Sequence, residues 1–324
     1  MNFGAVLVTG ASGFFGKNLI PELIKVRKIR ILARPSSNIQ LFKGNKDIEI
    51  VYGDLENNQA ISEALNGVDI IIHCAARTIG RNFTQFYKTN TLGTANLIQA
   101  IAKRNIKGII YLSSHTASGP SDEKRSCTEI EPARPISFYG MTKKFAEDII
   151  KRSDVPYIIL RPVSVYGPYD MEILKYIKLL NNGVCPIIGY GEKYLNLIYV
   201  NDLVHLVIKI VEAARFHNQT YFVNDGKCYS FTEILDEIAR QLNRKNFKIH
   251  IPESIALFFG LMNDIFLPKK KRLVGRDKIR ELAREYWLCS NESFTGEFGF
   301  TPKYSLERGM AETINWYRKY DFIR

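Results

Sequence analysis

A strand, a glycine turn and a helix open the chain, in the sequence Val6-Leu7-Val8-Thr9-Gly10-Ala11-Ser12-Gly13-Phe14-Phe15-Gly16. The β-branched run favours a strand, and the residues from 16 to 25 have helical periodicity. Backbone N–H groups at a helix N-terminus carry the positive end of the helix dipole, and glycines let a phosphate approach them. The spacing is GxxGxxG rather than GxGxxG, and a tight turn without a ligand is the alternative. Its place after the first strand favours a pyrophosphate site at Gly10, Ser12, Gly13, Phe14, Phe15 and Gly16.

Apolar, strand-like runs alternate with helical segments through the first half of the chain. The runs cover residues 6–8, 29–32, 48–51, 70–72, 109–112 and 158–160. The helical segments cover residues 16–25, 60–65, 92–102 and 139–150. This alternation predicts an α/β, Rossmann-type fold, in which a doubly wound parallel sheet carries helices on both faces.

The pattern changes after Pro168. Residues 169–195 are mixed, residues 221–224 read as one more strand, and residues 231–242 as a helix in a helix-rich remainder. We therefore expect a nucleotide-binding domain at 1–168 and 196–224. A smaller, helix-rich C-terminal substrate lobe would combine 169–195 with 225–324.

Composition narrows the class of protein. The 324 residues are 46% hydrophobic and 24% charged, which is ordinary for a globular protein. Five scattered cysteines without a CxxC pair indicate reduced thiols and a cytoplasmic location, and scattered histidines indicate no metal site. The net charge of +12 suits an anionic ligand, an anionic membrane surface or a solvated basic face, and we favour the last. We expect no nucleic-acid partner.

The end of the second predicted strand indicates which dinucleotide binds. Enzymes that use NAD place a carboxylate there for the ribose hydroxyls. This chain has no Asp or Glu at that point and offers Arg34, with Ser36 and Ser37 as hydroxyl donors, for a 2′-phosphate. NADP(H) is therefore favoured, with NAD(H) as the alternative. Asp54 and Leu55, after the third strand, are expected beside the adenine.

A tyrosine and a lysine four residues apart form the predicted catalytic pair. Tyr139 and Lys143 would share one face of a helix, where the ammonium can lower the tyrosine pKa. Ser114 ends a predicted strand and would face the ligand crevice, where it can hydrogen-bond a carbonyl or alkoxide oxygen. Thr116 is the reserve candidate, and Ser113 would face the core or the cofactor.

These motifs together resemble the extended short-chain dehydrogenase/reductase family, also called NAD-dependent epimerase/dehydratases. Further matching motifs are Asn90-Thr91-Leu92-Gly93-Thr94, Leu160-Arg161-Pro162-Val163-Ser164-Val165-Tyr166-Gly167-Pro168 and Ile198-Tyr199-Val200-Asn201-Asp202-Leu203. The resemblance implies a Ser114–Tyr139–Lys143 triad and a homodimer formed by the helices around 90–102 and 139–150. It also implies further cofactor contacts from Cys74, Ala75, Ala76, Asn90, Arg161, Pro162 and Val163, besides Tyr139 and Lys143.

Two branches of this family compete. Nucleotide-sugar epimerases and dehydratases carry an asparagine and an arginine where this chain has Ser164 and Leu195. The chain is more similar to dihydroflavonol reductases and 3β-hydroxysteroid dehydrogenases, which implies exchange of a ketone and a secondary alcohol on a small, apolar substrate. The alternative is a nucleotide-sugar epimerase or dehydratase with the same triad. The apolar segment from 255 to 262 would line that substrate or pack in the core of the small lobe.

A basic cluster at Lys269-Lys270-Lys271-Arg272 follows this apolar segment. A helix with such a cluster could rest on an anionic membrane surface. We favour a solvated basic turn after Pro268 and expect no membrane contact.

Overall fold

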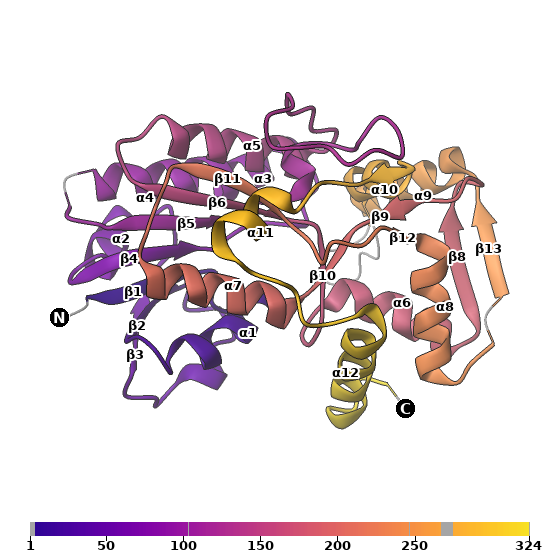
Figure 1. Ribbon diagram of the computed structural model, residues 1–324, viewed down its shortest axis with the longest axis horizontal. Coiled ribbons are helices and arrows are strands. Elements are labelled where there is room, and N and C mark those ends of the chain that lie inside the picture. Colours follow the sequence, from indigo (N-terminus) through magenta and orange to yellow (C-terminus); the bar gives the residue numbers. More distant parts are fainter. Residues whose placement is uncertain (1–3, 103, 246, 267–274, 324) are drawn as a thin grey trace.

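Seven parallel strands form the central sheet of the computed structural model, which describes residues 4–102, 104–245, 247–266 and 275–323 (Figure 1). The strand order is β11-β6-β5-β4-β1-β2-β3. The strands are β1 (Ala5–Thr9), β2 (Ile29–Ala33), β3 (Ile48–Tyr52), β4 (Val68–His73), β5 (Gly108–Leu112), β6 (Tyr157–Pro162) and β11 (Gln219–Val223). The predicted α/β class and all seven predicted strands are confirmed. The order turns back between β1 and β4, so the loops after these strands open a crevice at one edge of the sheet.

Helices cover both faces of this sheet. On one face α1 (Phe14–Leu23) packs beside α7 (Val200–Ala213), over side chains such as Val8 and Ile31. The other face carries α2 (Asn58–Ala64), α4 (Gly93–Ile101) and α5 (Phe138–Lys151). Alternate residues of each strand enter the two cores, as Leu7 and Val8 do, which explains why the strands are apolar throughout.

A third hydrophobic core lies beyond the carboxyl ends of the strands. It joins α6 (Met171–Asn181), β8 (Val184–Ile188), α8 (Phe231–Leu242) and α12 (Leu306–Lys319). The edge strand β13 (Phe247–Ile251) pairs in parallel with β8, at the right of Figure 1. Short strands connect this lobe to the sheet: β7 (Ser164–Tyr166), β9 (Tyr194–Leu195), β10 (Leu197–Tyr199), β12 (Tyr229–Ser230) and β14 (Tyr286–Trp287).

The division into two discontinuous segments per domain stays a prediction. Phe294 and Phe300, which it assigns to the small lobe, pack in the core on the α1–α7 face of the sheet. Phe294 belongs to α11 (Glu292–Phe298), which contacts β11 at the sheet edge.

The apolar segment from 255 to 262 forms part of α9 (Glu253–Phe266), which packs against α10 (Arg276–Leu282). Only Ala256 and Gly260 of α9 are buried, so the expectation of a packed core there is wrong. The basic cluster at Lys269 to Arg272 lies outside the described residues. None of the described helices is long and apolar enough to cross a membrane.

Candidate active site

The glycine turn brings β1, β4 and α1 very close together. Gly10 has a φ of +78°, and a Cβ there would lie 2.6 Å from the backbone nitrogen of Ala75. A Cβ on Gly16 would lie 2.6 Å from the Cα of Ala11, so only glycine lets α1 start so close to the turn. Gly13 is the N-cap of α1, and no described side chain caps it. The first N–H groups of α1 are therefore available to an anion.

A groove of about 370 Å³ opens in front of this turn. Its wall comes from the ends of four adjacent strands, β1, β2, β3 and β4. The predicted cofactor residues that line it are Gly10, Ser12, Gly13, Arg34, Ser37, Asp54, Leu55, Cys74, Ala75 and Ala76. Arg34 is exposed, so its guanidinium can reach a bound anion from the rim.

Several predicted cofactor residues lie elsewhere. Phe15 is buried, and Phe14 packs against the core on the α1 face. Asn90 is buried; its Oδ1 accepts a hydrogen bond from the Arg77 N–H at 2.7 Å, and its Nδ2 donates to Thr142 Oγ1 at 3.0 Å. Asn90 thereby fixes the chain after β4 to α5. Ser36 is exposed beside the groove, and Pro162 is buried at the end of β6.

Arg161 and Glu147 form an ion pair inside the protein. Both side chains are buried, and two hydrogen bonds of 2.9 and 2.7 Å join them. Ser113 Oγ donates to the same carboxylate at 2.6 Å, so this serine faces the core. The predicted cofactor contact of Arg161 is therefore replaced by a pair that ties β6 to α5.

Helix α5 places Tyr139 beside the end of β5. Ser137 caps the helix by accepting a hydrogen bond from the Gly140 N–H at 3.0 Å. Tyr139 and Ser114 line the same cavity, and Thr116 Oγ1 donates to Ser114 Oγ at 2.9 Å. Burial raises the pKa of Tyr139 to about 12; Glu281 raises it further, whereas Lys278 and a hydrogen bond with Ser114 lower it. This phenol therefore carries its proton at neutral pH, contrary to the expectation that the Lys143 ammonium lowers its pKa.

Lys143 is buried one turn further along α5. Its Nζ donates to the backbone oxygen of Leu112 at 2.6 Å and lies 4.1 Å from the centre of the Tyr111 ring. Burial lowers the pKa of Lys143 to about 7, although Cys74 and Glu147 both favour its charged form. These contacts hold Lys143 against the end of β5.

The cavity beside Tyr139 has a volume of about 190 Å³. Its apolar wall consists of Val163, Tyr176, Pro186, Ile188, Tyr194, Leu195, Phe231, Leu282 and Trp287. Three cationic residues, Lys193, Lys278 and Arg284, also line it. None of the apolar residues of α9 does, so the expectation that this segment lines the substrate is wrong. Ser164 and Leu195 both lie on the cavity wall. They stand where nucleotide-sugar epimerases and dehydratases carry an asparagine and an arginine, so these two positions can affect the choice of substrate.

Residues 6–223 match the NAD dependent epimerase/dehydratase family. The chain belongs to this family. The predicted resemblance is thereby confirmed, and the protein is an NAD(P)-dependent enzyme of the extended short-chain dehydrogenase/reductase type. Among the described residues, no group of three or more His, Cys, Asp or Glu side chains could hold a metal ion.

Relatives in this family differ in the substrates that their names give. The chain is 28% identical to the ceramide reductase of Caulobacter vibrioides, over 97% of this chain and 95% of the relative. It is 25% identical to the N-acetyl-alpha-D-glucosaminyl-diphospho-ditrans,octacis-undecaprenol 4-epimerase of Escherichia coli O157:H7, over 98% and 95%. The fold matches UDP-glucuronic acid 4-epimerase from Bacillus cereus in complex with NAD, with a TM-score of 0.80, 20% identity and coverage of 98% and 99%.

Two carboxylates of α10 hold the start of α5 in this member of the epimerase/dehydratase family. Asp277 accepts hydrogen bonds from the N–H groups of Phe138 at 2.7 Å and Tyr139 at 3.2 Å. Glu281 accepts a hydrogen bond from Ser137 Oγ at 2.6 Å. These contacts span about 140 positions of sequence, so no local pattern could have indicated them.

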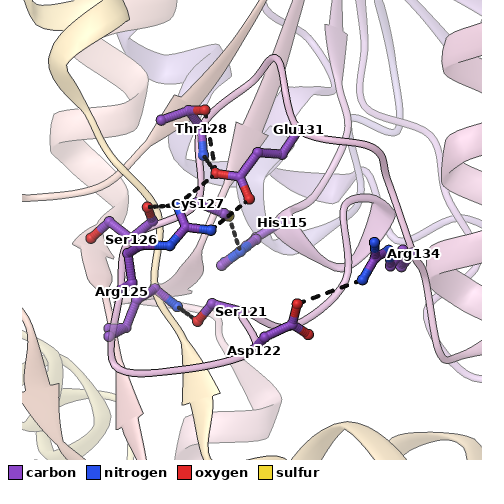
Figure 2. Close-up of polar contacts among 10 residues, drawn as sticks. His115, Ser121, Asp122, Arg125, Ser126, Cys127, Thr128, Glu131 and Arg134 are labelled. Carbon is purple, nitrogen blue, oxygen red and sulfur yellow. Dashed lines mark hydrogen bonds and ion pairs between the residues drawn. The ribbon is translucent and has the colours of Figure 1, made fainter.

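Polar contacts join the residues of a long loop that follows η3 (His115–Ala117), as Figure 2 shows. In this loop the Arg125 guanidinium donates two hydrogen bonds of 3.0 Å to the Glu131 carboxylate. These bonds lower the pKa of Glu131 to about 2. Cys127 Sγ lies 3.6 Å from His115 Nε2. Burial lowers the pKa of His115 to about 3, and it therefore stays neutral. His115 lines the cavity without being poised to exchange a proton at neutral pH.

Proposed function

We propose that the protein interconverts a ketone and a secondary alcohol on a substrate with an apolar body, using a Ser114–Tyr139–Lys143 triad. The observation that carries this proposal is the cavity itself: Tyr139 and Ser114 stand at a wall built mainly of aromatic and aliphatic side chains. Such a wall favours a ligand by about 25 cal/mol per Å² of apolar surface buried.

Tyr139 would donate its proton to the carbonyl oxygen, or accept one from the alcohol in the opposite direction. Ser114 Oγ would hold that oxygen by a hydrogen bond, with Thr116 orienting the serine hydroxyl. Lys143 would hold the ribose hydroxyls of the cofactor. The nicotinamide supplies the hydride chemistry when it is bound.

The cofactor groove fits a dinucleotide. The uncapped N-terminus of α1 and the close approach at Gly10 leave room and N–H donors for a pyrophosphate. Arg34 stands at the rim and would hold a 2′-phosphate, so NADP(H) is preferred over NAD(H) in this proposal. Val163 lines the cavity beside Tyr139 and would contact the nicotinamide.

A second candidate function is an epimerase or dehydratase that acts on a diphosphate-linked sugar. Lys193, Lys278 and Arg284 favour it, because three cations on one cavity wall could hold a diphosphate without the arginine that Leu195 replaces. Two of them already have carboxylate partners, Glu281 at 2.8 Å and Glu253 at 3.7 Å. The names of the two sequence relatives include one substrate for each function, and both of those substrates are lipids.

A homodimer is part of the same proposal. Phe83, Phe138 and Phe145 form an aromatic cluster between α3 (Phe83–Tyr87) and α5, and Phe145 is exposed. An exposed aromatic cluster of this kind is typical of an interface. We also keep the cytoplasmic location as a proposal; all five cysteines are unpaired.

Two measurements separate the candidates. NADPH should be consumed steadily with some member of a panel of apolar ketones, because a reductase does not return its cofactor to the starting state. UDP and UDP-sugars should leave the melting temperature of the NADP-bound protein unchanged. Saturable UDP binding, with no ketone that consumes NADPH, would exclude the reductase and support the epimerase.

A further inference from the structure

The apolar face of α9 points to solvent, whereas Ala256 and Gly260 on its other side are buried. Seven large apolar side chains of this 14-residue helix are exposed: Ile255, Phe258, Phe259, Leu261, Met262, Ile265 and Phe266. At about 100° per residue, all but Leu261 lie within an arc of about 120°. A surface helix of a globular protein normally has the opposite arrangement.

Contacts on the buried side of α9 prevent the helix from rotating about its axis to bury its apolar face. Ala256 and Gly260 are its buried residues, and a Cβ on Gly260 would collide with Ile279 of α10. Asp264 accepts a hydrogen bond from the Arg276 N–H at 3.0 Å, and Glu253 pairs with Arg284 at 3.7 Å. Small and acidic residues therefore fix α9 to α10 on the side opposite to the phenylalanines.

Charged side chains of α10 and of the residues after it lie beside α9. The α10 carboxylates Asp277 and Glu281 bind the start of α5. Lys278 and Arg284 line the cavity, pair with Glu281 and Glu253, and expose about half of their side chains. An apolar ridge one helix wide, with cations beside it, complements the surface of a bilayer that contains anionic lipids.

We infer that α9 is a membrane-docking helix, which lies in the plane of an anionic bilayer surface and buries its exposed apolar face among the lipids. This inference reverses the expectation of no membrane contact, because the sequence could not show which face of the helix is exposed. The docking surface consists of the seven exposed apolar side chains of α9. Since α10 lines the cavity through Lys278 and Leu282, docking holds the cavity close to the bilayer.

Vesicle flotation tests the inference on the full chain without any substrate. The wild type should float with vesicles of phosphatidylcholine and phosphatidylglycerol, and less with phosphatidylcholine alone or at high salt. The double variant Phe258→Ser/Phe259→Ser should bind the anionic vesicles at least about tenfold more weakly. Both side chains are about 60% exposed (59% and 61%), so its melting temperature should stay unchanged.

The matched control is Leu41→Ser/Tyr52→Ser, whose side chains are 61% and 51% exposed. Tyr52 ends β3, at the other end of the long axis of the molecule in Figure 1. This control should float like the wild type. Equal flotation of the α9 variant and the wild type would overturn the inference. A second outcome would also overturn it: the wild type does not bind vesicles but is a dimer in solution, and the α9 variant is a monomer. In that case α9 would join two copies of the chain. Ketone reduction is not the readout, so this test can fail while the proposed function stands.

Discussion

The cofactor groove and the substrate cavity are built in different ways. The groove is lined by residues between 9 and 89, from the loops after four neighbouring strands. The cavity is lined by residues between 114 and 287, which come from both lobes. The residues that line the groove therefore come from one stretch of the sequence. The cavity forms only when segments that are distant in sequence pack together. The groove is expected to control which cofactor binds, and the cavity to control turnover and substrate choice.

The largest expected effect comes from the buried pair of Arg161 and Glu147, which ties β6 to α5. Glu147→Gln would leave the Arg161 guanidinium buried without its counter-charge, and should lower the free energy of unfolding by about 3–5 kcal/mol. Urea denaturation measures this change. The control is Glu307→Gln, which removes an exposed partner of Arg240 and should cost less than about 1 kcal/mol. Equal effects of the two variants would show that the buried pair is no stronger than a surface one.

Replacing the proposed acid should affect the cavity without affecting the groove. Tyr139→Phe should lower turnover at least about 100-fold, the scale of a positioned acid or base, with cofactor affinity nearly unchanged. Steady-state kinetics and cofactor titration measure the two quantities separately. Tyr176→Phe, on the same cavity wall, should retain most activity. Near-normal turnover of Tyr139→Phe would refute its assigned role.

Lys143 should make the stability of the cofactor-free protein depend on pH. Because burial lowers its folded pKa to about 7, the folded protein loses this proton between pH 7 and 9 while the unfolded chain keeps it. The free energy of unfolding should therefore rise with pH in this window, by about 1–2 kcal/mol relative to Lys143→Met. Lys144→Met, one residue along α5, is the control and should follow the wild type. An identical pH slope in Lys143→Met and the wild type would contradict the buried environment.

The smallest expected effect concerns the rim of the groove. Arg34→Ala should reduce the preference for NADP(H) over NAD(H) by roughly tenfold, because it removes a charge-assisted contact with the 2′-phosphate. Titration of both cofactors at low and high salt measures the preference, which should shrink as salt screens this exposed contact. Turnover at saturating cofactor should not change. Equal affinities of the wild type for the two cofactors would overturn the NADP assignment.

Local sequence patterns determined the seven strands, the glycine turn and the approach of Arg34 and Asp54 to one groove. Each depends on residues that are neighbours in sequence or on the ends of adjacent parallel strands, so periodicity and spacing carry the information. Tertiary structure alone decided that Arg161 meets Glu147, that Asp277 and Glu281 hold the catalytic helix, and that α9 exposes its phenylalanines. An apolar helix has the same periodicity whether its partner is a protein core or a lipid surface. The contacts of Gly260 and Asp264 with α10 show which face is left outside.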